Sequence, residues 1–324
     1  MENLEIAIEQ IKAALPGLEI LENEPMSRHS SFKIGGPARA FAAPSDTSAF
    51  TSICRILKEN KLVPFVLGNG TNILFPDEGL KNLFVLSTER LTEMQLLPDG
   101  AIYAEAGVSL AKLASFAHQH SLKGLEFASG IPGSVGGGVL MNAGAYGGEL
   151  KDTVESVVYY SLPRQELCEV AAENCDFGYR SSYFHKTGGC AILSAVFRLE
   201  KGDSGEIAAK MRELNERRRD KQPLDLPSAG SAFKRPEGHF AAALIEQAGL
   251  KGYSVGGAQV SEKHSGFVVN KGSASAGDVQ QLMKDVRRIV FEKFGIVLEP
   301  EIIMLPPDYI PEDKSPAAPG SMAL

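Results

Sequence analysis

The sequence has few cysteines, and none lies in a metal-binding or redox spacing. The four are Cys54, Cys168, Cys175 and Cys190, and no two of them form a C-x-x-C pair. This spacing indicates neither a zinc site nor a redox dithiol. We therefore expect buried or inert thiols in a reducing compartment, and no bound metal.

Positive charge is also scarce. The chain carries 33 Lys and Arg against 40 Asp and Glu, a net charge of −7. This balance disfavours nucleic acid and anionic membranes as partners, so anionic ligands must meet local basic clusters. Residues 1–5 are acidic where a secretory signal would be basic, and no charge-free apolar run follows. We expect a cytoplasmic protein; its oligomeric state stays open, and a monomer is compatible with the sequence.

Residues 130–148 are the most distinctive stretch, because eight of these nineteen residues are glycine and none is charged. Glycine inside an element costs about 0.5–1 kcal/mol relative to alanine, so folds keep it where the backbone needs positive φ or a close approach. Exposed peptide N–H groups can wrap a pyrophosphate or lie along a ring system. A linker would be more polar, and a membrane span needs about 20 apolar residues. We expect a buried cofactor loop.

A second glycine-bearing turn, residues 68–72 with the sequence G-N-G-T-N, directly follows a compact apolar stretch. An Asn-Gly turn with free N–H groups and a hydroxyl can cradle a phosphate. Such turns after strands are usually no more than turns. Two glycine-rich loops in one chain nevertheless favour the cofactor interpretation.

Upstream of residue 130, hydrophobic spacing and turn residues predict alternating helices and strands. The expected elements are a helix over residues 4–15, a helix capped by Ser45 and running to about Asn60, a strand over 63–67, a hairpin over 93–106 turned at Asp99-Gly100, and a helix capped by Ser109. His118 and His120 lie two positions apart on that last helix, so they cannot share a metal. We expect both to face solvent.

Downstream, the same signals predict a second set of elements. These are strands over residues 153–161 and 189–199, a polar helix over 204–219, a helix over 240–248, strands over 253–260 and 266–270, a long helix over 276–294 and a final strand over 296–305. Residues 306–324 contain five prolines and little apolar content. We expect a disordered tail there.

Several short motifs also occur in a fixed order. They are G-N-G-T-N at 68–72, G-I-P-G-S-V-G-G at 130–137, M-N-A-G-A-Y at 141–146, Tyr179-Arg180, K-Q-P at 221–223, G-S-A-F at 230–233 and L-E-P-E at 298–301. Together they resemble the UDP-N-acetylenolpyruvoylglucosamine reductases, or UDP-N-acetylmuramate dehydrogenases, of bacterial cell-wall synthesis. The resemblance covers about residues 28–305 and is specific, because unrelated motifs agree in order and spacing.

The resemblance implies an α+β fold. A two-lobed FAD-binding domain of the vanillyl-alcohol-oxidase (PCMH) type would span residues 28–200, after an N-terminal helical segment over 1–27. A smaller α/β substrate-binding domain would span residues 201–305. The cofactor would be non-covalent FAD, held by Gly68, Asn69, Gly70, Thr71, Asn72, Gly130, Ile131, Pro132, Gly133, Ser134, Gly136, Gly137, Asn142, Gly144 and Ala145.

The reaction implied by the resemblance reduces the enolpyruvyl group of a UDP-sugar to UDP-N-acetylmuramate, with NADPH as co-substrate. Hydride addition leaves negative charge beside the carboxylate, so the site needs fixed positive charge and a proton donor. Among the residues that match catalytic positions, Arg180 would clamp the carboxylate, Ser231 would donate the proton and Glu301 would assist. The residues implied to hold the UDP-sugar are Tyr179, Arg218 and Arg235.

Without the resemblance, these residues have ordinary interpretations. Ser231 would be a turn serine, Glu301 a surface carboxylate, and Arg218 one of three arginines favoured at a helix C-terminus. The segment 180–189 is short, as in the subclass without an extra tyrosine-bearing loop, and the residues after Glu301 lack the expected Arg and Gly.

Two alternative functions stay open. One is another FAD-dependent oxidase or dehydrogenase of this fold that acts on a small alcohol or sugar acid. Many such enzymes tether their flavin through a histidine or a cysteine. The two glycine-rich loops of this chain contain neither residue. The other is a non-catalytic nucleotide-binding module.

Overall fold

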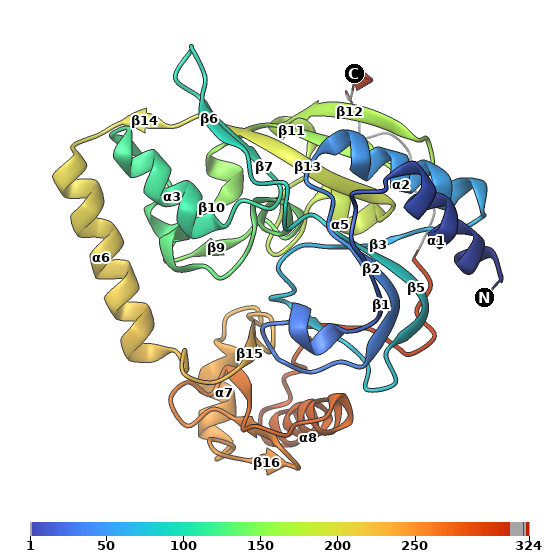
Figure 1. Cartoon of the computed structure of the whole chain (residues 1–324). Coiled ribbons are helices and arrows are strands. Elements are labelled where there is room, and N and C mark those ends of the chain that lie inside the picture. The colour runs from blue at the N-terminus through green and yellow to red at the C-terminus, as the bar shows by residue number, and fades with distance from the viewer. Residues whose placement is uncertain (1, 312–319, 321, 324) are drawn as a thin grey trace.

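The structure, a computed structural model, describes residues 2–311, 320, 322 and 323. These residues form two lobes and a C-terminal domain (Figure 1). Together they make an α+β fold, with helices and mixed or antiparallel sheets in each unit. None of the helices in this described part of the chain is long and apolar enough to cross a membrane.

The first lobe is a four-stranded sheet of order β1-β2-β5-β3 with two helices on one face. Its elements are α1 (Glu2–Ala14), β1 (Ile20–Pro25), β2 (Pro37–Ala42), α2 (Thr47–Glu59), β3 (Phe65–Leu67) and β5 (Leu80–Ser87). Side chains alternate along β5, so Phe84 packs under the helices while Val85 joins the core on the opposite face. Because β3 is an edge strand of this sheet, the turn that follows it lies at the sheet's edge, where its Asn72 side chain reaches the backbone of Glu301.

Two expectations change in this lobe. The N-terminal segment over residues 1–27 is part of the lobe, because β1 pairs with β2 and the apolar face of α1 is buried in the same core as α2. The predicted cap Ser45 is wrong by one residue. Asp46 caps α2 instead, and its carboxylate accepts a hydrogen bond from the Ala49 N–H at 2.8 Å.

The second lobe is an antiparallel sheet of order β20-β12-β11-β13-β7-β6. Its strands are β6 (Met94–Leu96), β7 (Ile102–Glu105), β11 (Val154–Ser161), β12 (Glu166–Ala171), β13 (Cys190–Phe197) and β20 (Met322–Ala323). The helices and small hairpins packed with it are α3 (Leu110–Gln119), β8 (Leu122–Lys123), α4 (Val135–Leu140), β9 (Gly144–Ala145), β10 (Gly148–Glu149), α5 (Tyr183–Thr187) and β14 (Glu200–Lys201). The hairpin predicted around Asp99-Gly100 is confirmed, and so is Ser109 as the cap of α3.

The two histidines expected to face solvent in the α3 region are only partly exposed. Each is half-buried and has a ring nitrogen near a backbone carbonyl oxygen: His118 Nε2 lies 3.1 Å from that of Ser204, and His120 Nδ1 lies 2.9 Å from that of Phe116. His118 thus joins α3 to the start of α6, whereas His120 bonds a carbonyl one turn back in its own helix.

The C-terminal domain is a four-stranded antiparallel sheet of order β15-β18-β17-β16 packed on two helices. Its elements are β15 (Ser228–Ser231), α7 (Ala241–Gln247), β16 (Ser254–Val255), β17 (Ala258–Val260), β18 (Phe267–Asn270) and α8 (Ala276–Phe294). The strand expected over residues 253–260 is in fact the hairpin β16–β17. The last expected strand shrinks to β19 (Ile303–Met304), which pairs in parallel with β4 (Ile73–Leu74) of the first lobe.

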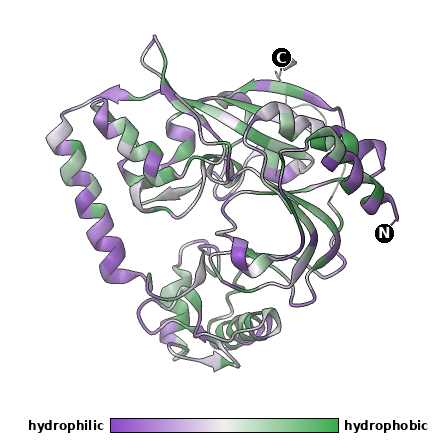
Figure 2. Ribbon diagram, viewed as in Figure 1, coloured by the Kyte–Doolittle hydropathy of each residue, from purple (hydrophilic) through white to green (hydrophobic). Residues whose placement is uncertain are grey.

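The helix α6 (Ser204–Lys221) runs from the second lobe to the C-terminal domain (Figure 1). It contacts α3 and the 3-10 helix at Glu126–Gly130, so it packs on the second lobe although the expected boundary placed it in the substrate domain. Its C-terminal half is hydrophilic (Figure 2).

The C-terminal domain is fastened to the first lobe. Phe32 and Leu74 of the first lobe are buried in its core. The Ser31 hydroxyl donates to the Ser228 carbonyl at 2.7 Å. Asp77 accepts hydrogen bonds from the first N–H groups of α8, at 2.8 Å from Ala276. These contacts fix β15 beside the turn that follows β3.

The expected disordered tail falls mostly on residues 312–319, 321 and 324, which lie outside the described residues. Of the remainder, Tyr309 packs edge-on against Phe65 of the first lobe, with ring centroids 5.7 Å apart. The tail thus begins against the first lobe.

Candidate active site

A cavity of about 220 Å³ lies where the two lobes and the C-terminal domain meet. Arg180 of the second lobe, Ser231 of β15 and Glu301 of the segment before β19 all line it. Both glycine-rich loops line it as well. The structure therefore brings the three expected catalytic residues together beside the expected cofactor loops.

Most of the expected cofactor-binding residues line this central cavity. They are Gly68, Asn69, Gly70, Thr71, Asn72, Ile131, Pro132, Gly133, Ser134, Gly137 and Gly144. The expected residues outside its lining are Gly130, Gly136, Asn142 and Ala145. A Cβ on Gly136 would lie 2.9 Å from that of Ala106, and one on Gly130 would lie 2.5 Å from the Asn215 side chain. Packing within the second lobe explains these two glycines.

Part of the glycine-rich segment is helical, which the sequence analysis missed. The helix α4 begins after Ser134, whose hydroxyl accepts a hydrogen bond from the Gly137 N–H at 3.4 Å. Glycine has low helix propensity, so burial of Val135 and Val139 in the second-lobe core must form this helix. The residues of the segment with positive φ are Asn142, Tyr146 and Gly147. Close packing, more than unusual φ, accounts for most of its glycines.

The cavity suits a flavin nucleotide. Apolar side chains such as Leu110 and Met141 supply walls for a flat ring. A Cβ on Gly133 would meet nothing nearer than 3.7 Å, so this backbone borders open space. Within the described part of the chain, no hydrogen bond engages the Asn69 or Thr71 side chain, although both line the cavity. Free polar groups beside bare backbone fit a phosphate-bearing ligand.

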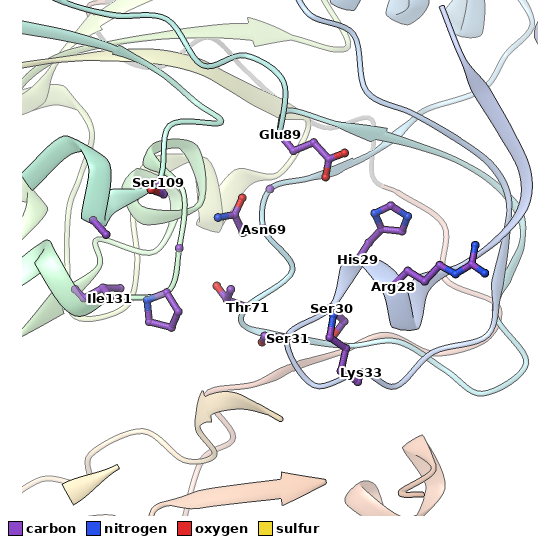
Figure 3. A pocket seen from close by; sticks show the side chains of 14 residues that line it. Arg28, His29, Ser30, Ser31, Lys33, Asn69, Thr71, Glu89, Ser109 and Ile131 are labelled. Atoms are coloured by element: carbon purple, nitrogen blue, oxygen red, sulfur yellow. The ribbon is translucent and has the colours of Figure 1, made fainter. Parts of the chain in front are cut away.

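A second cavity of about 410 Å³ shares Gly68, Asn69, Thr71 and residues 131–133 with the first (Figure 3). Its other wall carries Arg28, His29 and Lys33, which the sequence analysis did not single out. The basic and hydroxyl residues of the S-R-H-S-S-F-K stretch at 27–33 were the available signal. Arg28 and Lys33 bring positive charge to this cavity for an anionic ligand, partly offset by Glu89 in the same lining and by Glu24, which lies 3.5 Å from Arg28.

Arg180 occupies a strained turn at the edge of the central cavity. Its φ is +52°, in the left-handed region that costs non-glycine residues about 1–2 kcal/mol. Its Nε donates to the Glu301 carboxylate at 2.6 Å, and its Nη2 donates to the Gly144 carbonyl at 3.0 Å. Both contacts leave further guanidinium N–H groups for a ligand.

Glu301 is largely buried, and this burial raises the pKa of its carboxyl group even though the charges of Arg180 and Lys234 lower it. Its backbone N–H donates to the Ala232 carbonyl at 2.9 Å, and its carbonyl accepts from the Asn72 side chain at 3.3 Å. The chain here crosses from the C-terminal domain to the first lobe. Glu301 is therefore held by both units, and it is not the surface carboxylate of the ordinary interpretation.

Ser231 ends β15 after Gly230, whose φ of +75° accompanies a register irregularity against β18. The side chain is half-buried. Among the described residues, no hydrogen bond engages its hydroxyl, so the turn-serine interpretation, in which it bonds nearby backbone, is not what the structure shows. The hydroxyl is free to donate into the cavity.

A third cavity, of about 540 Å³, adjoins the central one through Arg180 and Gly144. Tyr179 and Arg235 line it, and the Arg235 backbone N–H donates to the Tyr179 hydroxyl at 3.3 Å. The Arg235 guanidinium lies 3.9 Å from the ring centroid of Phe240. Ala145 lines this cavity and not the central one.

Arg218 is not among the residues that line these three cavities. It is buried, its Nη1 donates to the Gly130 carbonyl, and burial lowers the pKa of its guanidinium. Its guanidinium carbon is 6.0 Å from the ring centroid of Tyr146, which lines the third cavity. Among the described residues, no group of His, Cys, Asp and Glu is placed to hold a metal.

Comparisons with known proteins agree with this arrangement. Residues 222–305 match the family model of the UDP-N-acetylenolpyruvoylglucosamine reductase C-terminal domain, and residues 38–163 match that of an FAD binding domain. The chain is 47% identical over 300 residues to the UDP-N-acetylenolpyruvoylglucosamine reductase of Caldanaerobacter subterraneus subsp. tengcongensis, covering 92% of this chain and 97% of that protein. The enzyme of the same name from Agathobacter rectalis is 47% identical over 309 residues, with coverage of 92% and 98%.

A solved structure is also similar. The crystal structure of UDP-N-acetylenolpyruvylglucosamine reductase from Thermus caldophilus superposes with a TM-score of 0.74 at 32% identity. The match covers 89% of this chain and 99% of that one. The similarity therefore extends over both lobes and the C-terminal domain.

Proposed function

The chain belongs to the UDP-N-acetylenolpyruvoylglucosamine reductase family, and from this we propose that it reduces the enolpyruvyl group of UDP-N-acetylglucosamine enolpyruvate to give UDP-N-acetylmuramate. FAD is its cofactor and NADPH its reductant. The observation that carries the proposal is the central cavity, where Arg180, Ser231 and Glu301 meet both glycine-rich loops. With this activity we expect a cytoplasmic protein of peptidoglycan synthesis, which supports cell shape and division.

The cofactor would occupy the central cavity and the basic cavity that shares its walls. When bound, FAD supplies hydride transfer between NADPH and the substrate. Gly133 and Gly137 leave room for the ring beside the apolar walls, while Asn69 and Thr71 are free to donate to phosphate oxygens. The cysteines are absent from all three cavity linings, and His29, which lines the second cavity, is engaged by the Glu24 carboxylate at 3.1 Å and stacks on Phe41; both features favour a non-covalent flavin.

Arg180 and Glu301 form the carboxylate-binding part of the mechanism. The N–H groups of Arg180 that Glu301 and Gly144 leave free would bind the substrate carboxylate. As hydride adds to the vinyl carbon, negative charge develops beside that carboxylate, and the fixed guanidinium stabilises it. Glu301 keeps the guanidinium plane oriented and offsets its charge in a buried place.

Ser231 would supply the proton. Its unbonded hydroxyl lines the same cavity, so a donor is available on the side of the C-terminal domain while Arg180 holds the substrate from the second lobe. A serine hydroxyl is a weak acid, but it can protonate a carbanion-like centre if water restores the proton. The remaining carbon would thus be protonated without a charged acid in the cavity.

The third cavity would hold the UDP group. Arg235 and Tyr179 line it, and Arg180 connects it to the central cavity. Stacking on Phe240 at 3.9 Å orients the Arg235 guanidinium while its charge stays available for a pyrophosphate. Arg218 would contribute through Tyr146 or by supporting Gly130, since its guanidinium is buried.

An activity assay tests the proposal. Protein loaded with FAD is given NADPH without oxygen, with and without the enolpyruvyl UDP-sugar. We expect continuous NADPH consumption, matched by UDP-N-acetylmuramate, only when the sugar is present. Oxygen uptake with a small alcohol or sugar acid, and no turnover of NADPH, would instead support an oxidase. A protein that never binds FAD would support a non-catalytic module.

A further inference from the structure

Asn142 was expected to contact the cofactor, but its side chain is committed to the protein. It is completely buried and does not line the central cavity. Its Nδ2 donates to the Gly178 carbonyl at 2.9 Å and to the Glu149 carboxylate at 3.1 Å. Its Oδ1 accepts from the Lys151 backbone N–H at 3.0 Å. Few hydrogen-bonding positions remain for a ligand.

The Gly178 carbonyl that Asn142 binds belongs to the turn that presents Arg180. In this turn the Gly178 N–H donates to the Ser181 carbonyl at 2.9 Å, and the Ser181 N–H donates back at 3.3 Å. Arg180 has a left-handed backbone there, which an arginine keeps only when its surroundings enforce it. The Asn142 side chain joins the backbone of this turn to the glycine-rich segment, and just after the turn the Ser182 hydroxyl donates to the Leu140 carbonyl at 2.7 Å.

Two further residues, Gly144 of the same segment and Glu149 just after it, act on Arg180. Gly144, two residues after Asn142, accepts from the Arg180 side chain at 3.0 Å. Gly144 pairs with Glu149 in the β9–β10 hairpin. The positive charge of Arg180 is also among the causes that lower the pKa of Glu149, after Lys151 and Asn142, so the two side chains act on each other. Residues 142–149 thus support Arg180 through backbone, hydrogen bonds and charge.

We propose that Asn142, supported by Glu149, is a positioning residue that fixes the Arg180 turn at the edge of the cavity, and that it does not bind the cofactor. The proposal rests on the proposed function, because it assigns Arg180 to the substrate carboxylate. Displacement of the Arg180 guanidinium by about 1 Å can slow the reaction by about 10²-fold.

The test uses Asn142→Gly and Asn142→Asp in the full-length holoenzyme. Glycine tolerates the φ of +43° at this position and removes the side chain, while aspartate keeps the shape and replaces the donor. Lys151→Arg is the matched control, since it keeps the positive charge that pairs with Glu149 and the backbone N–H that donates to Asn142. We expect the control to stay within about twofold of the parent in both half-reactions.

For both Asn142 variants, we expect parental flavin content and flavin reduction by NADPH. Reoxidation by the enolpyruvyl UDP-sugar should slow by about 10- to 100-fold. A parental reoxidation rate, equal slowing of both half-reactions, or loss of flavin from both variants would each overturn the proposal.

A pH profile supplies a readout that a purely structural role would not move. The charged groups facing Glu301 are Arg180 and Lys234. If Arg180 shifts away, the pKa of Glu301 rises further, so its titration in the reoxidation rate should move to higher pH in Asn142→Gly. Glu301→Gln identifies that titration by abolishing it, and an unmoved profile contradicts the proposal.

Failure of the proposed function can be distinguished from failure of this inference. If the parent itself is not reoxidised by the sugar, the function is wrong. The inference is then decided by a crystal structure of Asn142→Gly, in which we expect the Arg180–Glu301 pair to be separated. A pair retained at the parental 2.6 Å would refute it.

Discussion

Replacing Ser231 with alanine removes the proposed proton donor and leaves the other residues of the site in place. The hydroxyl is half-buried, lines the central cavity and, among the described residues, has no hydrogen-bond partner. Its removal therefore breaks no hydrogen bond within the described chain, and we expect a change in the free energy of unfolding below about 0.5 kcal/mol. The consequence should be confined to chemistry.

The expected loss in the reoxidation rate follows from the role of Ser231 as a proton donor. A positioned proton donor contributes about 10²- to 10⁴-fold, which corresponds to about 2.7–5.4 kcal/mol of the activation barrier. Hydride transfer from NADPH to the flavin needs no proton from Ser231. Ser231→Ala should therefore reduce its flavin at the parental rate and be reoxidised by the UDP-sugar at least 10²-fold more slowly.

Stopped-flow absorbance of the flavin measures both steps without oxygen. Ser231→Cys should recover part of the loss, because a thiol can also donate. Ser228→Ala is the matched control, since Ser228 lies on the same strand and does not line the cavity. Reoxidation of Ser231→Ala at the parental rate would refute the role of Ser231 as the acid.

Three other predictions concern the cavities. Gly133→Val should lower flavin occupancy at near-parental thermal stability, whereas Gly136→Val should lower the melting temperature because its side chain meets the second-lobe core; full occupancy in Gly133→Val would show that the flavin lies elsewhere. Arg235→Ala and Arg218→Ala should each raise KM for the UDP-sugar and leave the reduction of the flavin by NADPH unchanged. Equal damage to both half-reactions in either variant would assign that arginine a structural role. Burial raises the pKa of Glu301 above 4.5, so ionising this carboxyl group costs more in the folded chain than in the unfolded one. The melting temperature of the parent, measured relative to that of Glu301→Gln, should therefore fall as pH rises from about 4.5 through the folded pKa. A difference in melting temperature that stays constant over this range would contradict this.

The elements with strong local signals could be predicted from the sequence. The long helix α8 matches its predicted bounds because Ser275 caps it, its apolar residues recur on one face and Gly295 ends it with φ of +69°. The hairpin at Asp99-Gly100 was equally local. The family motifs also predicted that residues far apart in the chain belong to one site.

What escaped prediction depends on tertiary contacts. The helix α4 forms in a glycine-rich stretch because the second-lobe core buries its valines. The final strand is short because residues 299–302 pair with backbone near Ala232 before the chain reaches β4. Arg28 and Lys33 join the cavity wall through folding of the first lobe, and no periodic pattern marks them. Such features depend on partners that are distant in sequence.

Anaerobic visible spectroscopy of the parental protein shows whether it carries a flavin that NADPH reduces and the enolpyruvyl UDP-sugar reoxidises. We expect a yellow protein whose flavin absorbance bleaches on addition of NADPH and returns, without oxygen, when the enolpyruvyl UDP-sugar is added. One cavity would then serve both half-reactions. A protein that stays colourless with added FAD, or a reduced flavin that remains bleached in the presence of the sugar, would contradict it.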